Sequence, residues 1–191
     1  MKKYKIILLS TLSVFLLVLS SKTKAQCNCT IKQGDFIADI EPVTGNETAV
    51  EFYQYNTPNG ASSNTSFELG NAASLFLYQD TNTGIVSLVI IFDDITAGGD
   101  TDGGAASISF NCLPETATLD LSDDTNEVTG MPPNLVGGWR WAPCCTDGAI
   151  IGGIDCNSTL DLIVDIERGI DNFRWLSGSN NIDLDPDIIS I

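Results

Sequence analysis

The sequence predicts an all-β protein, a disulfide-tied antiparallel β-sandwich of immunoglobulin-like or jelly-roll topology. Three observations lead to this prediction. Short segments that alternate apolar and polar residues recur along the chain, with turn residues between them. Aspartate outnumbers glutamate by 18 to seven, which favours turns over helices because the aspartate side chain bonds neighbouring backbone groups. The chain shows no heptads, long amphipathic helix or solenoid repeat.

The chain begins with the three parts of a secretory signal peptide. Three lysines precede an apolar stretch over residues 6–19, and Thr23 and Ala25 form a small-residue cleavage site. The apolar stretch is short for a transmembrane helix, and no stop-transfer segment follows it. We therefore expect residues 1–25 to be removed and residues 26–191 to form one exported domain, secreted or at the cell surface.

The clearest strand patterns lie in the middle and towards the end of the chain. Residues 74–79 and 85–92 flank the turn sequence Asp-Thr-Asn-Thr-Gly, which predicts a hairpin. The second of these strands is apolar on both faces, so we expect a central strand that is covered on both sides. Residues 105–112, 116–121 and 159–167 alternate, which indicates half-buried antiparallel strands.

Weaker strand patterns bring the expected number of strands to nine or ten. Strands of this number and spacing fit a β-sandwich. One further segment, residues 169–176, is expected to form a single helical turn. The weaker strand candidates are residues 35–40, 48–55, 135–141, 149–154 and 181–191.

The exported part of the chain is strongly acidic. The whole chain carries a net charge of −16, and removal of the five lysines of the leader lowers it by five, to −21. All 25 carboxylates lie beyond Gly34, among only four cations. Such a surface repels nucleic acid and anionic membranes, so we expect neither as a partner, and it attracts multivalent cations or basic surfaces. Plain solubility is the alternative explanation.

Six cysteines behind a signal peptide predict up to three disulfides. Direct bonds within the pairs 27/29 and 144/145 are unfavourable, since neighbouring cysteines rarely reach disulfide geometry. We expect one cysteine of the first pair to bond one of the second, and Cys112 or Cys156 to take the other member of the second pair. Without histidine, a zinc site is not expected. The six are Cys27, Cys29, Cys112, Cys144, Cys145 and Cys156.

The densest group of acids lies at residues 92–104, where an Asp-x-Asp-Gly turn follows a strand. Ca²⁺ takes six to eight oxygen ligands in flexible geometry, which alternating aspartates and glycine-freed carbonyls supply. The spacing differs from the twelve-residue helix-loop-helix site. A second acidic turn, which includes Glu127, follows another strand, and two such loops at one end of a sandwich could share an ion. The candidate Ca²⁺ ligands are Asp93, Asp94, Asp100, Asp102, Asp123 and Asp124.

Residues 137–148 are the segment of most unusual composition. Trp139 and Trp141 share one face of a predicted strand, and Arg140 lies on the other. Two tryptophans on one face can stack on sugar rings while Asp147 bonds hydroxyl groups. The candidate ligand-binding residues are therefore Trp139, Trp141 and Asp147. The alternative is that both tryptophans pack in the core beside the disulfides.

Catalysis has little support in the sequence. Without histidine, neither a Ser-His-Asp nor a Cys-His scheme can be built. A glycoside hydrolase needs only two carboxylates at a set separation, but nothing marks one pair among the 25 acids. We therefore expect no enzymatic activity and no organic cofactor.

Parts of the chain resemble exported proteins of gliding, Bacteroidetes-type bacteria. The leader end Lys-Ala-Gln at 24–26, followed by Cys-Asn-Cys-Thr, is similar to such proteins. The run Gly-Ile-Val-Ser-Leu-Val-Ile-Ile-Phe-Asp-Asp at 84–94 and Cys-Cys-Thr-Asp-Gly at 144–148 are similar to amino-terminal β modules of their large surface proteins. The resemblance implies a surface or adhesin role without catalytic residues.

Together these observations predict a secreted or cell-surface β-sandwich module that binds or supports other molecules. We expect it to be stabilised by Ca²⁺, to act in adhesion, and to contact a glycan or another surface protein. The alternative is a carbohydrate-binding accessory module or a carbohydrate-active enzyme.

Overall fold

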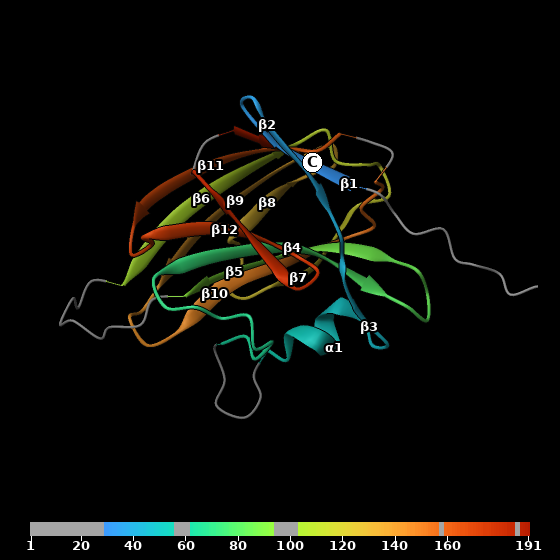
Figure 1. Ribbon diagram of the computed structural model, residues 1–191. Coiled ribbons are helices and arrows are strands. Elements are labelled where there is room, and N and C mark those ends of the chain that lie inside the picture. Colours follow the sequence, from blue (N-terminus) through green and yellow to red (C-terminus); the bar gives the residue numbers. More distant parts are fainter. Residues whose placement is uncertain (1–28, 56–61, 94–102, 157–158, 186–187) are drawn as a thin grey trace, which may run out of the picture.

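Two β-sheets pack face to face in the computed structural model of the chain, which describes residues 29–55, 62–93, 103–156, 159–185 and 188–191 (Figure 1). Within these ranges the one helix is α1 (Ala49–Tyr53), and no helix has the length and hydropathy needed to cross a membrane. The predicted all-β sandwich is therefore confirmed.

The first sheet, called sheet I here, has seven strands. Side chains alternate along its middle strands: in β11 (Asp161–Arg168), Leu162 and Val164 are buried, whereas the residues that follow each of them, Ile163 and Asp165, are exposed. The alternation expected over 159–167 is thus present, and it separates a buried inner face from an exposed outer face. In order across the sheet the strands are β2 (Phe36–Ile40), β1 (Cys29–Gln33), β14 (Ile188–Ser190), β11 (Asp161–Arg168), β6 (Gly104–Asn111), β9 (Asn134–Trp141) and β8 (Val128–Met131).

The second sheet, sheet II, also has seven strands. Its neighbours are antiparallel except for two parallel pairs, β12 with β4 and β3 with β4. Six strands follow one another across the sheet, and β3 (Val43–Gly45) adds to β4 beside them. The six are β13 (Asn180–Leu184), β12 (Asn172–Ser177), β4 (Ala72–Asp80), β5 (Val86–Asp93), β10 (Thr146–Gly152) and β7 (Thr118–Ser122).

Sheet II is covered on both faces, which explains why β5 is buried along its whole length. Leu88 and Ile90 contribute to the main core between the sheets. Val89 and Ile91 belong to a second core on the other face, which α1 helps to close with Tyr53. Figure 1 shows α1 below sheet II, on the side away from sheet I. The expectation of a central strand covered on both sides is therefore confirmed.

The strand expected at 116–121 is present as β7 but is not half-buried, because none of its residues is fully buried and Leu119 is exposed. Two further segments differ from expectation in secondary structure. Residues 48–55 were expected as a strand, but they contain α1, because Thr48 and Glu51 form a capping box. Thr48 Oγ1 accepts from the Glu51 amide at 3.2 Å, and Glu51 Oε2 accepts from the Thr48 amide at 2.9 Å. Residues 169–176 were expected as a helical turn, but they include β12, which pairs along β4 with Trp175 opposite Leu75. Long-range pairing decides the conformation there.

The disulfide pairing also differs from expectation. Cys29 bonds Cys156, and the adjacent Cys144 and Cys145 bond each other. The last two lie in the short turn between β9 and β10, where the amide of Cys145 donates to the carbonyl of Ala142 at 3.1 Å. Strand β1 is separated from β9 by three strands of sheet I, so this turn does not reach Cys29.

Of the other two cysteines, only Cys112 lies in the described part of the chain. Cys112 is exposed, rather than inward as the alternation predicts, and it has no disulfide partner among the described residues. It follows directly after β6 with a positive φ of 64°, which turns its side chain out of the alternating pattern. Cys27 lies outside the described residues. The prediction that the protein contains disulfide bonds is confirmed, although the predicted pairing is wrong.

The two bonds should contribute very differently to stability. The Cys29–Cys156 bond spans 127 residues, whereas the bond between Cys144 and Cys145 spans one. A cross-link over a long loop restricts the unfolded chain strongly, so replacing Cys29 and Cys156 by alanine should lower the free energy of unfolding by about 4 kcal/mol. The matched double variant at 144 and 145 should change it by less than about 1 kcal/mol. Urea unfolding measures both, and equal losses would contradict this assignment.

Candidate functional site

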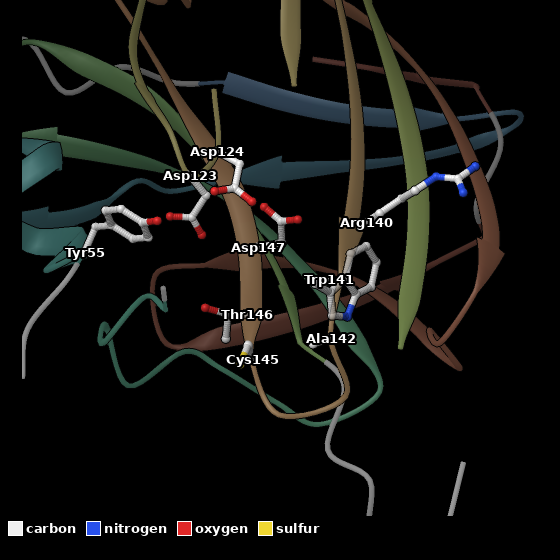
Figure 2. A pocket seen from close by; sticks show the side chains of 9 residues that line it. All are labelled: Tyr55, Asp123, Asp124, Arg140, Trp141, Ala142, Cys145, Thr146 and Asp147. Atoms are coloured by element: carbon white, nitrogen blue, oxygen red, sulfur yellow. The ribbon is translucent and has the colours of Figure 1, made fainter. Parts of the chain in front are cut away.

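A pocket of about 290 Å³ opens where the turn between β9 and β10 meets the turn after β7 (Figure 2). Three carboxylates, two aromatic rings, one cation and one disulfide sulfur contribute to its wall. The lining residues are Tyr55, Asp123, Asp124, Arg140, Trp141, Ala142, Cys145, Thr146 and Asp147.

Strand pairing brings the acidic residues of the pocket together. β10 pairs with β7 so that Ala149 lies opposite Ser122, and the chain that leaves β7 then passes Asp147. The amide of Asp123 donates to the carbonyl of Gly148 at 3.2 Å, which fixes the turn against β10. Two acids 24 positions apart in the sequence thereby share one pocket.

Gly148 is required at the base of the pocket. A Cβ atom at this position would overlap the carbonyl oxygen of Ile90 on β5. The amide of Gly148 donates to Asp147 Oδ1 at 2.8 Å, and its carbonyl also accepts from Trp139 Nε1 at 3.3 Å. Close packing of β10 on β5 therefore sets the orientation of the Asp147 carboxylate.

Two of the pocket carboxylates are buried with few partners. Asp123 is 8% exposed and Asp147 is 4% exposed. The hydroxyl of Tyr53 donates to Asp123 Oδ2 at 3.3 Å, but Oδ1 of the same side chain is buried without a hydrogen-bond partner. Arg140 does not neutralise them, because its guanidinium points away from the carboxylates (Figure 2) and lies 3.8 Å from Glu167.

Burial without a neighbouring cation makes these groups hold protons. Burial raises the pKa of Asp123 to about 7, against the hydrogen bond from Tyr53, and the negative charges of Glu127 and Asp124 add to the rise. Burial also raises the pKa of Asp147 to about 8, together with the charges of Glu127 and Asp123. The pKa of Glu127 is raised as well, again mainly by burial.

The structure brings together only some of the predicted Ca²⁺ ligands. Asp123 and Asp124 line the pocket. Asp93 is buried at the end of β5, where its register partner is Thr146 on β10. Asp94, Asp100 and Asp102 lie outside the described residues. In the described part of the chain, no three acidic or cysteine side chains stand in an arrangement that could hold a metal ion.

The predicted ligand-binding residues separate into two environments. Asp147 lies in the acidic pocket. Trp139 is 1% exposed and packs in the core with its ring centroid 5.1 Å from that of Phe92. Trp141 is 6% exposed, and its ring stacks on that of Phe92 with the ring centroids 5.1 Å apart. It also lines the pocket. The two tryptophans therefore do not form an exposed platform for sugar rings.

Sequence reasoning missed two tyrosines of the site. Tyr53 and Tyr55 both lie within residues 48–55, which were expected to be a strand. Instead α1 ends at Tyr53, whose hydroxyl donates to Asp123, and Tyr55 follows it in the wall of the pocket. The capping pattern Thr-x-x-Glu at 48–51 was visible in the sequence and is the signal that identifies the helix.

Comparison with known proteins adds no assignment: no family model, curated protein or solved structure matches the chain. The pocket is therefore the feature of the molecule that bears on its function.

The raised pKa values predict that the protein becomes less stable as the pH rises. In the unfolded chain both aspartates lose their protons near pH 4. In the folded protein the pKa is about 7 for Asp123 and about 8 for Asp147. Between about pH 4 and these values the folded state therefore binds more protons than the unfolded chain. The free energy of unfolding, and with it the midpoint of thermal unfolding, should therefore fall between about pH 5.5 and about pH 8 in metal-free buffer.

Asp147→Asn should remove much of this pH dependence, because asparagine does not titrate. Asp165→Asn is the matched control, since this exposed residue of β11 lies on the outer face of sheet I. Thermal unfolding followed by circular dichroism at several pH values measures both variants. A midpoint that stays level or rises with pH in the metal-free native protein would contradict the buried, uncompensated state of these carboxylates.

Proposed function

We propose that the chain is an exported β-sandwich binding module of adhesion type whose acidic pocket binds a cation, with Ca²⁺ as a stabilising ion. One observation carries the proposal: Asp123 is buried at the pocket with its Oδ1 atom lacking any hydrogen-bond partner. A buried carboxylate oxygen without a partner is costly, and a bound cation removes that cost. The disulfides support export, because such bonds persist in oxidising compartments.

Repulsion inside the pocket also favours a cation. In addition to burial, the negative charges of Glu127 and Asp124 raise the pKa of Asp123, and those of Glu127 and Asp123 raise the pKa of Asp147. Two carboxylates about 4 Å apart repel by roughly 4 kcal/mol at an effective dielectric constant of 20. Either protons or a bound cation can relieve that repulsion, and outside the cell millimolar Ca²⁺ competes with the protons.

Asp123, Asp147 and Asp124 are the residues that would hold the ion. Ca²⁺ accepts variable geometry and completes its six to eight ligands with water, so it tolerates ligands that are not yet in final position. Asp124 is exposed in the turn after β7, where its side chain is free to rotate toward the two buried carboxylates. The ion would therefore order this turn.

The same carboxylates argue for binding rather than glycoside hydrolysis. A pair that serves as acid and base has pKa values pushed apart, so that one group is ionised while the other is protonated. Here the pKa values of Asp123 and Asp147 are both raised, to about 7 and about 8. This pattern supports a site that exchanges protons for a cation.

Calcium should raise the unfolding temperature through this pocket. Extracellular sites of this kind bind with dissociation constants of about 10⁻⁴–10⁻³ M, so about 10 mM Ca²⁺ should add about 1.4–2.7 kcal/mol, or roughly 3–10 °C. Asp123→Asn and Asp147→Asn should each abolish the increase, and Asp165→Asn should retain it. Mg²⁺ should act more weakly, because it demands stricter octahedral geometry.

Differential scanning calorimetry with and without the ion, at about pH 7.5, makes the measurement. A midpoint that does not move with Ca²⁺ in the native protein would contradict calcium binding. A shift that persists in both pocket variants would place the ion elsewhere.

A further inference from the structure

The pocket is larger than a metal ion requires. Its volume of about 290 Å³ is many times the roughly 30 Å³ that one water molecule occupies in the liquid. Among the described residues, no three acidic side chains form a ready-made set of metal ligands. Both facts suit a cation that is itself extended.

The walls of the pocket are chemically mixed. Asp124 and Asp147 direct their carboxylates toward one another, and Asp123 lies between them and the hydroxyl of Tyr55 (Figure 2). On the other side of Asp147 the wall is formed by the indole of Trp141 and by Ala142. Acceptors for several hydrogen bonds thus stand next to an aromatic and apolar surface.

We propose that the acidic pocket receives the guanidinium group of an arginine side chain from a partner protein. The inference rests on the proposed function, that the pocket binds a cation, and it names the chemical class of ligand. A guanidinium presents five N–H donors in one plane, so it donates to several carboxylate oxygens at once. Its flat face also stacks on aromatic rings, and the ring of Tyr55 lines the pocket.

The buried carboxylate of Asp123 favours a ligand that donates hydrogen bonds as well as carrying positive charge. Asp123 is more than nine-tenths buried and lines the pocket, and its Oδ1 atom has no hydrogen-bond partner, so a ligand that reaches this atom must bring an N–H or O–H group. A lysine ammonium is a compact charge that needs closely converging acceptors, whereas the arginine fork reaches acceptors at separate points. The geometry therefore favours arginine over lysine.

Of the three arginines in the described part of the chain, only Arg140 lines the pocket, and it does not neutralise the carboxylates there. Arg140 lies beside Glu167, and Figure 2 shows its head directed away from the carboxylates. Arg174 donates to Ser74 Oγ at 2.9 Å and to the carbonyl of Phe67 at 2.7 Å. A second copy of the chain is a poor source of the cation, because the net charge of −16 makes copies repel. A basic partner is instead attracted by that charge.

The probe is the blocked peptide acetyl-Gly-Arg-Gly-amide, titrated into the purified protein in metal-free buffer and followed by amide chemical shifts. Shifts should concentrate at residues 123–127 and 141–148. The citrulline peptide keeps the shape and loses the charge, and its affinity should fall by about tenfold or more. The lysine peptide should bind more weakly than the arginine peptide.

Two variants and one control complete the design. Asp147→Asn and Asp124→Asn should each weaken the arginine peptide by about tenfold, and Asp124 is exposed, so its substitution leaves the core intact. Asp165→Asn should not change the affinity. Equal binding of the arginine and citrulline peptides, or unchanged binding in both pocket variants, would overturn the inference.

A parallel titration with Ca²⁺ separates the two proposals. Calcium binding that is lost in Asp147→Asn, without any binding of the arginine peptide, would overturn the arginine inference and leave the cation-binding function in place. Failure of both Ca²⁺ and the peptide would overturn both. Arginine binding with displacement by Ca²⁺ would support both at one site.

Discussion

Strand β10 lies between β5 and β7 in sheet II, and its register holds both the fold and the pocket in place. Ile151 enters the main core and Ile150 enters the second core, so a shift of one residue would exchange them. The same register places Asp147 at the rim and presses Gly148 against β5, where no side chain fits. The acidic pocket is therefore a consequence of how two apolar faces are filled.

Local periodicity predicted several strands whose burial alternates or is complete, although it missed β1, whose burial also alternates. The segment 159–167 became β11 because its buried side chains occupy every second position, and 85–92 became β5 because both faces of sheet II are covered. The same reasoning failed at 48–55, where the capping box outweighs the β pattern. It also failed at 169–176, where pairing with β4 outweighs a helical preference. Such pairing is a property of the folded sheet, and periodicity does not contain it.

The site was predictable in its chemistry and not in its assembly. Asp123 and Asp124 were recognisable as an acidic turn, and Asp147 as a polar residue beside the tryptophans, but each was assigned to a different site. Their convergence depends on the pairing of β10 with β7, which no local pattern encodes. The bond between Cys144 and Cys145 escaped prediction for a related reason. Its turn is confined between β9 and β10, which keeps distant cysteines away.

An acidic pocket within an acidic domain must obtain its counter-charge from outside. Only four cations follow the leader, and Arg140, which lines the pocket, is directed to Glu167 instead. Protons supply part of the compensation, as the pKa of about 8 for Asp147 indicates, but they leave the buried Oδ1 of Asp123 without a partner. A ligand that carries both positive charge and hydrogen-bond donors satisfies both requirements at once. Binding such a group would recognise the partner and also stabilise the fold, because a ligand that binds only the folded state shifts the unfolding equilibrium toward that state.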